Sequence, residues 1–528
     1  MMKKQLIALG VASVLLASAL VGCGNGGGNN PVTKGSAESA SGTTDTGMKN
    51  ISIMTVDFNG SAMSADGSEE VIKRMEAYTN THVDFTWAAS DSYEDKLGVM
   101  LMDKSNMPMI LTALGTSLNS TMVQAAKADA FWDLTEYLKD SEKYPNLSQA
   151  NENVLKALTV DGKIIGIYRA RPIGRNGLGY RKDWADKLGL EEPKTIEDVY
   201  NMAKAFTEQD PDGNGKNDTY GLSLSKAVDS FDIVQAWFGA GNGWVLEDEK
   251  LKPSFETEGY MEALDWFKKM YNEGLVFEDF AVRDASTRSD ALKNGQCGML
   301  VDVLDESRRI WDYFVNNEIP AMNGDETASM GLVGSIAKEG GDDPVTLATA
   351  GMNGYFVITK AAAKTEEDVE ACLSYLDKMC DNEMLVLADY GIEGISYELD
   401  EEGKIVMGNT LELTQQPNNG LNQVLCYIPN AASTDPVIKR TERQELEEKV
   451  KAENVERAVY NPGAGYLANS ETYSMNGGNL DQSLIDARIQ YICGQIDKAG
   501  LEKAWKNWSD LGGEKIIEQV NALYNADK

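Results

Sequence analysis

The sequence contains one loop in which oxygen-bearing side chains recur at the spacing of a metal site. These side chains belong to Asp210, Asp212, Asn214 and Asp218. They occupy positions 1, 3, 5 and 9 of an EF-type loop, and the backbone carbonyl of Lys216 falls at position 7. The spacing therefore predicts a structural Ca²⁺ site. Position 12 is Gly221, so Thr219 or water would complete the shell. The alternative is a connector closed by its own Asx-turn hydrogen bonds.

Aromatic side chains are the second chemical signal, because the apolar faces of sugar rings stack on them while polar side chains bind the hydroxyls. Trp87 closes a predicted strand, so both ligand stacking and ordinary packing are open for it. Trp184 and Trp266 lie at helical spacing with Leu188 and Met270, which favours core packing. The other tryptophans interpreted as structural are Trp132, Trp311, Trp505 and Trp508.

The composition excludes several classes of function. The chain has 49 Lys and Arg against 83 Asp and Glu, a net charge of −34, which argues against nucleic acid and against adsorption onto an anionic membrane. A Ser-His-Asp triad would need His82, the one histidine, and a site with several histidines cannot form. The two carboxylates of a glycoside hydrolase cannot be excluded by counting acids.

The N-terminus predicts export and a lipid anchor. Residues 1–22 have a basic start and then an apolar run too short to span a bilayer, as in a cleaved signal peptide. The run ends in Leu-Val-Gly before Cys23, which resembles a bacterial lipobox with Cys23 as the acylated residue. The alternative is a plain secretory signal with an incidental cysteine. The rest of the segment 23–48 predicts a flexible tether.

Short strands and longer helices alternate from residue 50 onward. Strands over 51–56, 83–87 and 109–112 enclose helices over 69–78 and 93–103, which predicts a parallel sheet with helices on both faces. Ligands bind beyond the C-terminal edge of such sheets, where Asp57, Phe58, Trp87 and the loop from Ala113 would meet. Later elements are strands over 163–168, 300–303 and 354–359, and helices opening at 180 and covering 196–207, 260–272, the stretch up to 379, 480–498 and 513–524.

Several motifs, in the same order along the chain, resemble one family of binding proteins. They are Tyr180–Leu190, Pro193–Thr195, Asp210–Gly215, Gly295–Met299 and Tyr390–Gly394. The chain from about Asn50 onward resembles extracellular solute-binding proteins of family 1, the maltose-binding-like superfamily, in particular its lipoproteins from Gram-positive bacteria. The resemblance implies a two-lobed α/β fold of the type II periplasmic-binding-protein class, hinged like a flytrap. Its lobes would comprise residues 49–167 with 350–410, and 168–349 with 411–528.

The resemblance also implies which residues face the cleft between the lobes. The stretch Asp229–Trp244 resembles the family's cleft-lining helix start and glycine-rich turn. The strand before Asp302 has a family counterpart that enters the cleft, and the crossover strand precedes Arg169. For each residue, a structural or solvated surface role is the alternative. The ligand-binding candidates are Asp57, Phe58, Trp87, Tyr168, Arg171, Asp229, Phe231, Trp237, Trp244, Asp302, Asp305 and Tyr473, the last in a loop before a helix starting at Leu480.

The function implied is the substrate-binding component of an ABC importer. It would be lipid-anchored on the outer face of a Gram-positive cell membrane, bind an oligosaccharide without turnover, and contact the importer's transmembrane subunits as a monomer. Family loops similar to Asp210–Asp218 bind Ca²⁺ structurally. The alternatives are a peptide-binding or sensory lipoprotein of the same fold, and a glycoside hydrolase.

Overall fold

The computed structural model describes residues 47–57, 68–89, 92–103, 106–226, 229–284, 287–407, 420–429 and 438–528. The chain divides into two units, residues 1–46 and 47–528. The predicted signal peptide, the lipidation site Cys23 and nearly all of the tether therefore lie outside the described residues. Within the described ranges, no helix is both long and apolar enough to cross a membrane.

The first lobe is built on a mixed five-stranded sheet. Its strand order is β2 (Thr81–Ala89), β1 (Lys49–Asp57), β3 (Ile110–Ala113), β14 (Met352–Ile358) and β6 (Ile167–Ala170). The first three strands are parallel, which confirms the predicted β-α-β-α-β order, whereas β14 runs antiparallel to both β3 and β6. The sheet is mixed because β14 returns from the second lobe and enters between two earlier strands.

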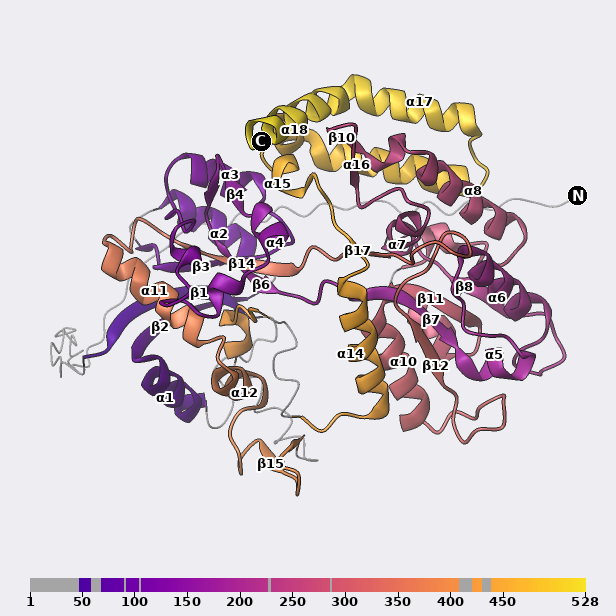
Figure 1. Cartoon of the computed structure of the whole chain (residues 1–528), viewed down its shortest axis with the longest axis horizontal. Helices are drawn as coiled ribbons and strands as arrows, with labels where there is room; N and C mark the ends of the chain where they lie inside the picture. The colour runs from indigo at the N-terminus through magenta and orange to yellow at the C-terminus, as the bar shows by residue number, and fades with distance from the viewer. Residues whose placement is uncertain are drawn as a thin grey trace, which may run out of the picture. The chain divides into compact units, whose positions relative to one another are not determined.

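Helices and short hairpins cover this sheet. Figure 1 shows α1 and α11 beside β1 and β2, where their apolar faces meet the core. The core also includes Leu421–Ile428, beyond residue 410, at which the predicted first lobe ends. The remaining elements are α1 (Ser68–Thr79), α2 (Tyr93–Met102), α3 (Ser120–Lys127), α4 (Glu152–Lys156), α11 (Glu366–Lys378), α12 (Asn382–Tyr390), β4 (Thr159–Val160), β5 (Lys163–Ile164), β15 (Tyr397–Leu399), β16 (Ile405–Met407), η3 (Tyr137–Lys139), η4 (Leu147–Gln149) and η7 (Leu421–Val424).

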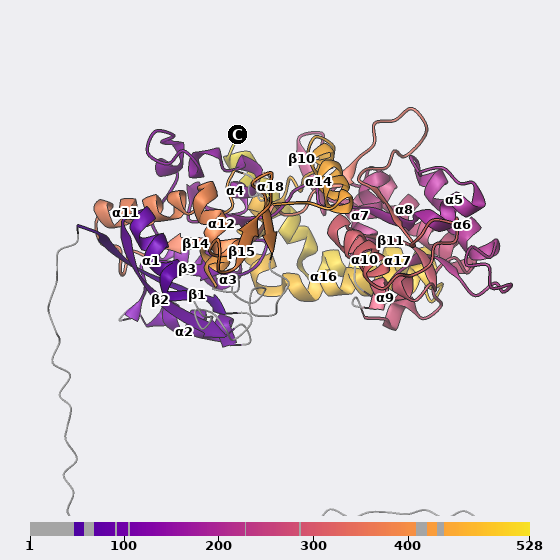
Figure 2. The same cartoon turned by 90° about the horizontal axis from the view of Figure 1, so that it is seen from below.

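The second lobe has its own four-stranded sheet, whose strands are labelled in Figure 1; Figure 2 shows one of them, β11 (Cys297–Val303), well apart from β1 and β14 of the first sheet. The order of the second lobe's sheet is β12 (Met330–Val333), β7 (Asn176–Arg181), β11 and β8 (Tyr220–Ser223). The helix predicted to open at Tyr180 begins later, because all six residues of β7 are buried between β12 and β11. Around the sheet lie α5 (Lys182–Leu188), α6 (Ile196–Glu208), α7 (Asp229–Trp237), α8 (Glu258–Asn272), α9 (Thr287–Lys293), α10 (Leu304–Asn316), β9 (Trp244–Glu247), β10 (Lys250–Pro253), η5 (Ser254–Glu256) and η6 (Phe280–Val282).

The C-terminal part is helical, as predicted, but its long helix differs from the prediction. The helix α16 runs over Glu471–Ile492, so the predicted range 480–498 is wrong at both ends. Ser470 starts it by accepting a hydrogen bond from the backbone N–H of Tyr473. The other elements are α14 (Glu442–Val455), α15 (Ala464–Leu467), α17 (Lys498–Trp508), the π-helical turn η9 (Ser509–Gly513) and α18 (Glu514–Ala526).

Three chain segments cross between the two sheets and pair with one another. The N–H of Arg171 donates to the carbonyl of Gly351 at 2.9 Å, and that of Thr349 donates to Ile173 at 3.1 Å. On the other side, the short strands β13 (Thr346–Leu347) and β17 (Ala458–Val459) run parallel. The lobes are therefore joined by a small hydrogen-bonded ribbon, which we call the crossover ribbon: residues 171–173, 346–351 and 457–459.

Candidate functional site

A cleft of about 620 Å³ is lined by residues from both lobes and from the crossover ribbon. The first lobe contributes the loop after β3, from Thr116 to Ser120, and helix α4. Because β3 is parallel to β1, this loop leaves the C-terminal edge of the sheet, where the sequence predicts a ligand. The other side consists of the turn before β9, the segment Tyr460–Ala468, Tyr473 and Tyr524.

Uncharged polar side chains dominate the cleft. Acids make up 83 of the 528 residues, yet no Asp or Glu occurs among the described residues that line it. The one cationic side chain in that lining is Lys156, at the end of α4. The amides and phenols that line the cleft are those of Asn119, Asn153, Asn242, Asn461, Tyr460, Tyr466, Tyr473 and Tyr524.

Among the described residues, Tyr473 is the one ligand-binding residue predicted from the sequence that lines this cleft. It lies in the first turn of α16, which corrects the predicted loop position. Its ring lies over Gly477, where a Cβ atom would come within 2.6 Å of the ring, so this glycine inside a helix is explained by the close approach. Its hydroxyl donates to Asp481 at 2.7 Å, and burial raises the pKa of both groups. The phenol is held in place with oxygen lone pairs left to accept a ligand's hydrogen bond.

Two further tyrosines form an aromatic wall of the cleft. The rings of Tyr466 and Tyr524 meet edge to face, with centroids 5.8 Å apart and planes at 75°. Burial, with the nearby Asp527 carboxylate, raises the pKa of Tyr466 to about 12. Edge-to-face packing fixes both rings, so they present apolar surface without the entropy loss of ordering flexible side chains.

Asn242 connects the cleft to the crossover ribbon. Its amide N–H₂ donates to the carbonyls of Ala348 at 3.0 Å and Val459 at 2.9 Å. This leaves the amide oxygen as a hydrogen-bond acceptor on a side chain fixed by two bonds. A ligand bound there would contact a group that holds two crossing segments together.

Tyr168 and Arg171 lie in a different hollow, of about 550 Å³, between the crossover ribbon and α14. The Tyr168 hydroxyl is buried and accepts a 2.6 Å hydrogen bond from the backbone N–H of Asn151. Arg171 donates to the carbonyl of Ala170, and burial lowers the pKa of its guanidinium. Both residues therefore lie on the α14 side of the crossover ribbon and do not line the cleft.

A half-buried carboxyl group, that of Asp389 at the end of α12, belongs to the same region. Tyr427 donates a 2.7 Å hydrogen bond to it. Burial raises the pKa of Asp389 to about 6, although the Tyr427 hydrogen bond and the Arg171 charge act in the opposite direction. This carboxyl group therefore titrates close to neutral pH.

The aromatic candidates of the second lobe are core residues. Phe231, Trp237 and Trp244 are 6%, 2% and 5% exposed. Phe231 packs edge to face on Tyr260, with ring centroids 5.2 Å apart. Although Asn242 and Leu246 flank Trp244 and line the cleft, the indole itself points into the packed interior of the lobe.

Asp302 and Asp305 lie in ion pairs. Asp302 pairs with Arg288 at 2.8 Å. Asp305 binds Arg175 through both oxygens, at 2.6 and 2.7 Å, and also contacts Arg309 at 2.7 Å. Burial opposes ionisation of Asp305, yet the two guanidinium groups hold its pKa at about 2. Its carboxylate oxygens are therefore engaged within the second lobe.

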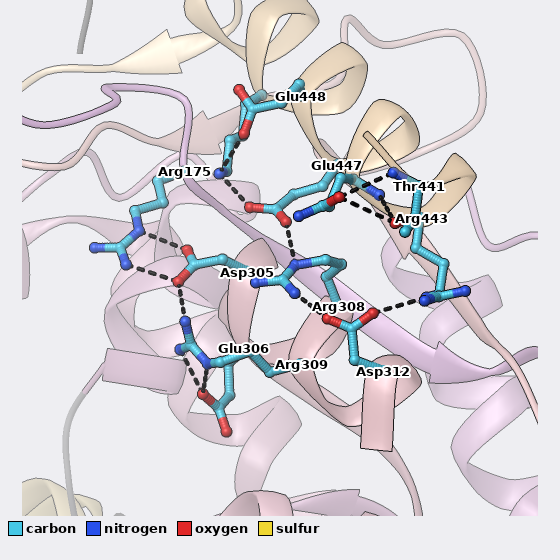
Figure 3. Close-up of polar contacts among 12 residues, drawn as sticks. Arg175, Asp305, Glu306, Arg308, Arg309, Asp312, Thr441, Arg443, Glu447 and Glu448 are labelled. Atoms are coloured by element: carbon cyan, nitrogen blue, oxygen red, sulfur yellow. Dashed lines mark hydrogen bonds and ion pairs between the residues drawn. The ribbon is translucent and has the colours of Figure 1, made fainter. Parts of the chain in front are cut away.

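A second group of ion pairs lies beside the Asp305 group and joins α10 to α14 (Figure 3). Arg308 donates to Glu447 at 2.7 Å and also pairs with Asp312, which in turn binds Arg443 at 2.7 Å. Lys451 pairs with Glu447 and, at 3.0 Å, with Glu448. We call this set the α10–α14 ion network: Arg175, Asp305, Glu306, Arg308, Arg309, Asp312, Arg443, Glu447, Glu448 and Lys451.

The remaining candidates lie at or beyond the edge of the described residues. Asp57 ends β1, and Phe58 lies outside the described residues. Trp87 is half-buried on the edge strand β2, stacked on Phe85 with centroids 5.4 Å apart. Asp229 begins α7, but its side chain is among those not described.

The predicted calcium loop is folded around Asn214. The backbone N–H of Asn214 donates to Asp210 at 3.0 Å, and its amide donates to Asp212 at 2.7 Å and Asp218 at 3.0 Å. Thr219 is buried and donates to the carbonyl of Phe206 at 2.7 Å, which ties its hydroxyl to α6. In the described part of the chain, no group of three or more His, Cys, Asp or Glu forms a metal cluster. The oxygen chemistry suits Ca²⁺, but in this conformation the carboxylates are satisfied by Asn214.

Most cleft residues were missed because their signal is weak in sequence. The loop after Ala113 is part of the predicted crevice, and Thr116–Ser120 fall in it. The tyrosines and asparagines of the segment 460–466 carry no periodic pattern, and the turn composition Asn461-Pro462-Gly463 predicts only a loop. Their role follows from the return of the chain through the crossover ribbon, which sequence spacing does not show.

The comparisons with known proteins agree on one group. The family described as bacterial extracellular solute-binding protein matches residues 70–389. The chain is 35% identical over 532 residues to lipoprotein LipO of Bacillus subtilis, covering 100% of this chain and 99% of that protein. It is 30% identical to the polygalacturonan/rhamnogalacturonan-binding protein YtcQ of the same species, covering 87% of this chain and 89% of that one. The structure of Streptococcus pneumoniae FusA in complex with kestose superposes with a TM-score of 0.60 at 19% identity, covering 91% of this chain and 100% of that one.

Proposed function

Because the chain belongs to the bacterial extracellular solute-binding proteins, we propose that its cleft binds an oligosaccharide and that the protein delivers this ligand to an ABC-type importer. The family consists of binding proteins, so the chain is not an enzyme. Its two-lobed fold is the type II solute-binding fold of its structural neighbours. The ligand and the importer are the parts of this statement that need a test.

The composition of the cleft carries the proposal. Amide groups and phenols supply donors and acceptors that match sugar hydroxyls, and the Tyr466–Tyr524 pair supplies apolar ring surface. A neutral saccharide needs no counter-charge, and no described residue of the lining is acidic. Two relatives support a saccharide by name: one binds polygalacturonan or rhamnogalacturonan, whose galacturonate units are anionic, and one is a component of a transporter for neutral fructooligosaccharides.

The same composition disfavours the two alternatives. A free peptide has a cationic and an anionic end, but only Lys156 could neutralise one of them. Glycoside hydrolysis uses a pair of carboxylates beside the scissile bond, and the described lining has none. Asp481 is near, but its oxygen accepts the Tyr473 hydrogen bond.

The proposal also includes a lipid anchor on Cys23 and a Ca²⁺ ion in the loop Asp210–Asp218. The protein would be held at the outer face of the membrane by lipid on Cys23, consistent with the name of the lipoprotein relative. The loop Asp210–Asp218 would bind Ca²⁺ once Asn214 releases the three carboxylates, with the backbone carbonyl of Lys216 as a further ligand. Such a metal would stabilise the second lobe, since the loop follows α6 and precedes β8.

Calorimetric titration of the mature protein tests the ligand class. The panel comprises oligogalacturonides, rhamnogalacturonan fragments, kestose, and di- to pentapeptides. We expect binding of at least one saccharide, with that saccharide recovered intact after incubation. Binding of peptides alone would contradict the proposal, and so would shortening of a bound saccharide.

A further inference from the structure

The hollow of about 550 Å³ beside α14 has walls from both lobes, and we call it the α14 hollow. The first lobe contributes Gln149 and Tyr168, and the crossover ribbon contributes residues 171–173 and Gly351. The facing wall is α14, from residue 448 to residue 456. Figure 1 shows α14 beside the segments that cross between the lobes. A molecule in this hollow would therefore touch both lobes and the hinge between them.

The guanidinium group of Arg171 lines the hollow without a carboxylate partner. One of its N–H groups donates to the carbonyl of Ala170 at 2.9 Å, and no carboxylate of the described residues forms an ion pair with it. Asp389 acts on Arg171 from a longer distance, and its oxygen accepts the Tyr427 hydrogen bond. No nitrogen of Arg171 is among the atoms that the described fold buries without a partner, so its other N–H groups are accessible from the hollow. A half-buried cation without a counter-charge is costly, and an anion would offset this cost.

A second guanidinium group, that of Arg169, adds positive charge at the same end of the ribbon. Arg169 is 2% exposed, and its N–H groups donate to uncharged oxygens, among them the carbonyl of Asn422 at 3.2 Å and the side chain of Gln423 at 2.9 Å. Burial, and then the charge of Arg171, lower the pKa of Arg169 to about 10. The two cations repel each other in surroundings of low dielectric constant, so an anion at the accessible one would reduce this repulsion.

The α14 wall supplies a further donor. Lys451 lines the hollow, and its ammonium pairs with Glu447 and, at 3.0 Å, with Glu448. An ammonium has three N–H groups, so these two partners leave one for another acceptor. Glu448 is paired in this way, and Glu456, the other acid of the described lining, is exposed. The charges that face the interior of the hollow are therefore mainly positive.

We propose that the α14 hollow binds a small oxyanion, a phosphate or carboxylate group, between Arg171 and Lys451. A guanidinium group binds such an anion through two parallel N–H donors, which fixes its orientation as well as its charge. A cation in the hollow would meet the charge of Arg171, and a neutral ligand would leave that charge uncompensated.

An anion in the α14 hollow would act on the cleft through the crossover ribbon. Val154 lines both spaces, residues 348–350 line the cleft, and Gly351 lines the hollow, so one thin hinge separates the two. Rotation about the ribbon that brings the cleft walls together moves α14 away from Arg171. An anion held between Arg171 and Lys451 opposes this rotation and weakens saccharide binding, and by linkage the saccharide weakens anion binding by the same factor. This coupling rests on the proposed function.

Scanning calorimetry of the full mature chain tests the anion site. Sodium phosphate and sodium acetate are compared with sodium chloride at equal ionic strength and neutral pH. We expect phosphate or acetate to raise the thermal midpoint by about 2 °C above chloride. Arg171→Gln should remove this rise, and any rise that persists in this variant measures general exclusion of the salt from the protein surface. Arg74→Gln is the control, because Arg74 is exposed and pairs with Glu70 on α1.

A second variant decides the question even if Arg171→Gln does not fold. Ala452→Glu adds an acid to an exposed position of the α14 wall, so it should abolish the rise. Ala522→Glu makes the same charge change at an exposed position of α18 outside both spaces, and it should keep the rise. Equal rises in the unmodified protein and in both hollow variants would overturn the anion site.

Titration of the cleft tests the coupling. The saccharide that the calorimetric panel identifies is titrated with phosphate and with chloride, and we expect about fivefold weaker binding in phosphate. Arg171→Gln should remove this difference. Equal affinity in the two salts would overturn the coupling. If no saccharide binds, the proposed function fails, yet the thermal midpoints still decide the anion site.

Discussion

The cleft and the α10–α14 ion network lie on different sides of the crossover ribbon and use opposite chemistry. The cleft has one cation and no acid among its described lining residues, whereas the network has ten charged side chains in two ion-paired groups, nine of them on α10 and α14 and the tenth Arg175. Each charge in the network has a partner, so little desolvation cost is left uncompensated. A ligand-binding surface with such charges would need partners of its own. The comparison teaches that the described lining of the cleft contains none of the ion-paired side chains of this acidic protein, so the proposed ligand would meet mainly neutral groups.

The network should be the more sensitive of the two regions to loss of a single group. Glu447→Ala leaves Arg308 and Lys451 without their buried carboxylate, since the Glu447 side chain is 5% exposed. We expect a loss of about 3–4 kcal/mol of unfolding free energy, measured by urea denaturation. Glu453→Ala on the same helix is the control, because Glu453 is exposed and 4.0 Å from Lys449. Equal small effects of both changes would contradict the structural role of the network.

Removing the charge of Asp389 should stabilise the protein, whereas removing Glu447 should destabilise it. The pKa of Asp389 is about 6 in the folded protein, above its ordinary value, so the folded state binds the extra proton. Stability should therefore fall as pH rises from about 4 to 6, and the cost should be fully present at pH 7. Asp389→Asn should remove this slope and stabilise the protein by about 2–3 kcal/mol at pH 7. Urea denaturation from pH 4 to 8 measures it, with Glu401→Gln as the exposed control. An unchanged slope in Asp389→Asn would disprove the assignment.

In the cleft, loss of one neutral side chain should affect binding more than folding. Tyr473→Ala should weaken saccharide binding about tenfold through loss of ring contact and of the phenol. Its effect on the binding constant is measured by calorimetry, with Tyr137→Ala, outside the cleft lining, as control. The contrast between the regions fails if Tyr473→Ala unfolds the protein but Glu447→Ala does not.

The loop Asp210–Asp218 is the proposed Ca²⁺ site, and the effect of Ca²⁺ on thermal stability tests it. Ca²⁺ at about five times its dissociation constant should stabilise the fold by about 1 kcal/mol, seen as a rise in the thermal midpoint. Asp212→Asn should abolish the rise, whereas Asp325→Asn, in another Asx turn, should leave it intact. If Ca²⁺ has no effect on the unmodified protein, the loop is a connector closed by Asn214.

The smallest effect concerns Lys156, the one charged side chain among the described residues that line the cleft. Lys156→Met should leave kestose binding unchanged, because a neutral sugar has no group for the ammonium. It should weaken an oligogalacturonide a few-fold, and only at low salt, since Lys156 is exposed. Titrations at low and high sodium chloride measure this. Salt-dependent loss of kestose binding would show that the neutral character of the cleft has been misjudged.

The sequence predicted more of the fold than of the site. Strong periodicity and β-branched runs located the strands over residues 51–56 and 83–87 and most helices, because local burial patterns determine them. The Gly477–Gly478 pair concealed the start of α16, because glycine is unfavourable inside a helix and the sequence does not show that the Tyr473 ring lies over Gly477 one turn later. The three parallel strands were predicted, but the antiparallel pairing of β14 beside β3 was not, because the place of β14 depends on a distant return of the chain.

Site residues were harder because their types carry little information alone. Asp305 has the chemistry to accept sugar hydroxyls, yet Arg175 and Arg309 engage it, and this pairing spans residues far apart in sequence. Tyr473 was predicted as a ligand-binding residue from its place just before a predicted helix near the C-terminus; in the structure it lies in the first turn of α16 and lines the cleft. Asn242, two residues before Trp244, was not predicted because tryptophan is the stronger stacking group for a sugar, whereas the fold buries the indole and places the amide at the cleft.

The position of β14 also has a consequence for how the protein reaches its native state. Among the described strands of the first sheet, β6 pairs with β14 alone, and β14 begins at residue 352, after all four strands of the second lobe's sheet. As the chain emerges from the ribosome, the early strands therefore cannot complete their sheet until most of the polypeptide has been made. Such a delay leaves the growing chain unfolded for longer, and an unfolded chain is the form that passes through a narrow export channel.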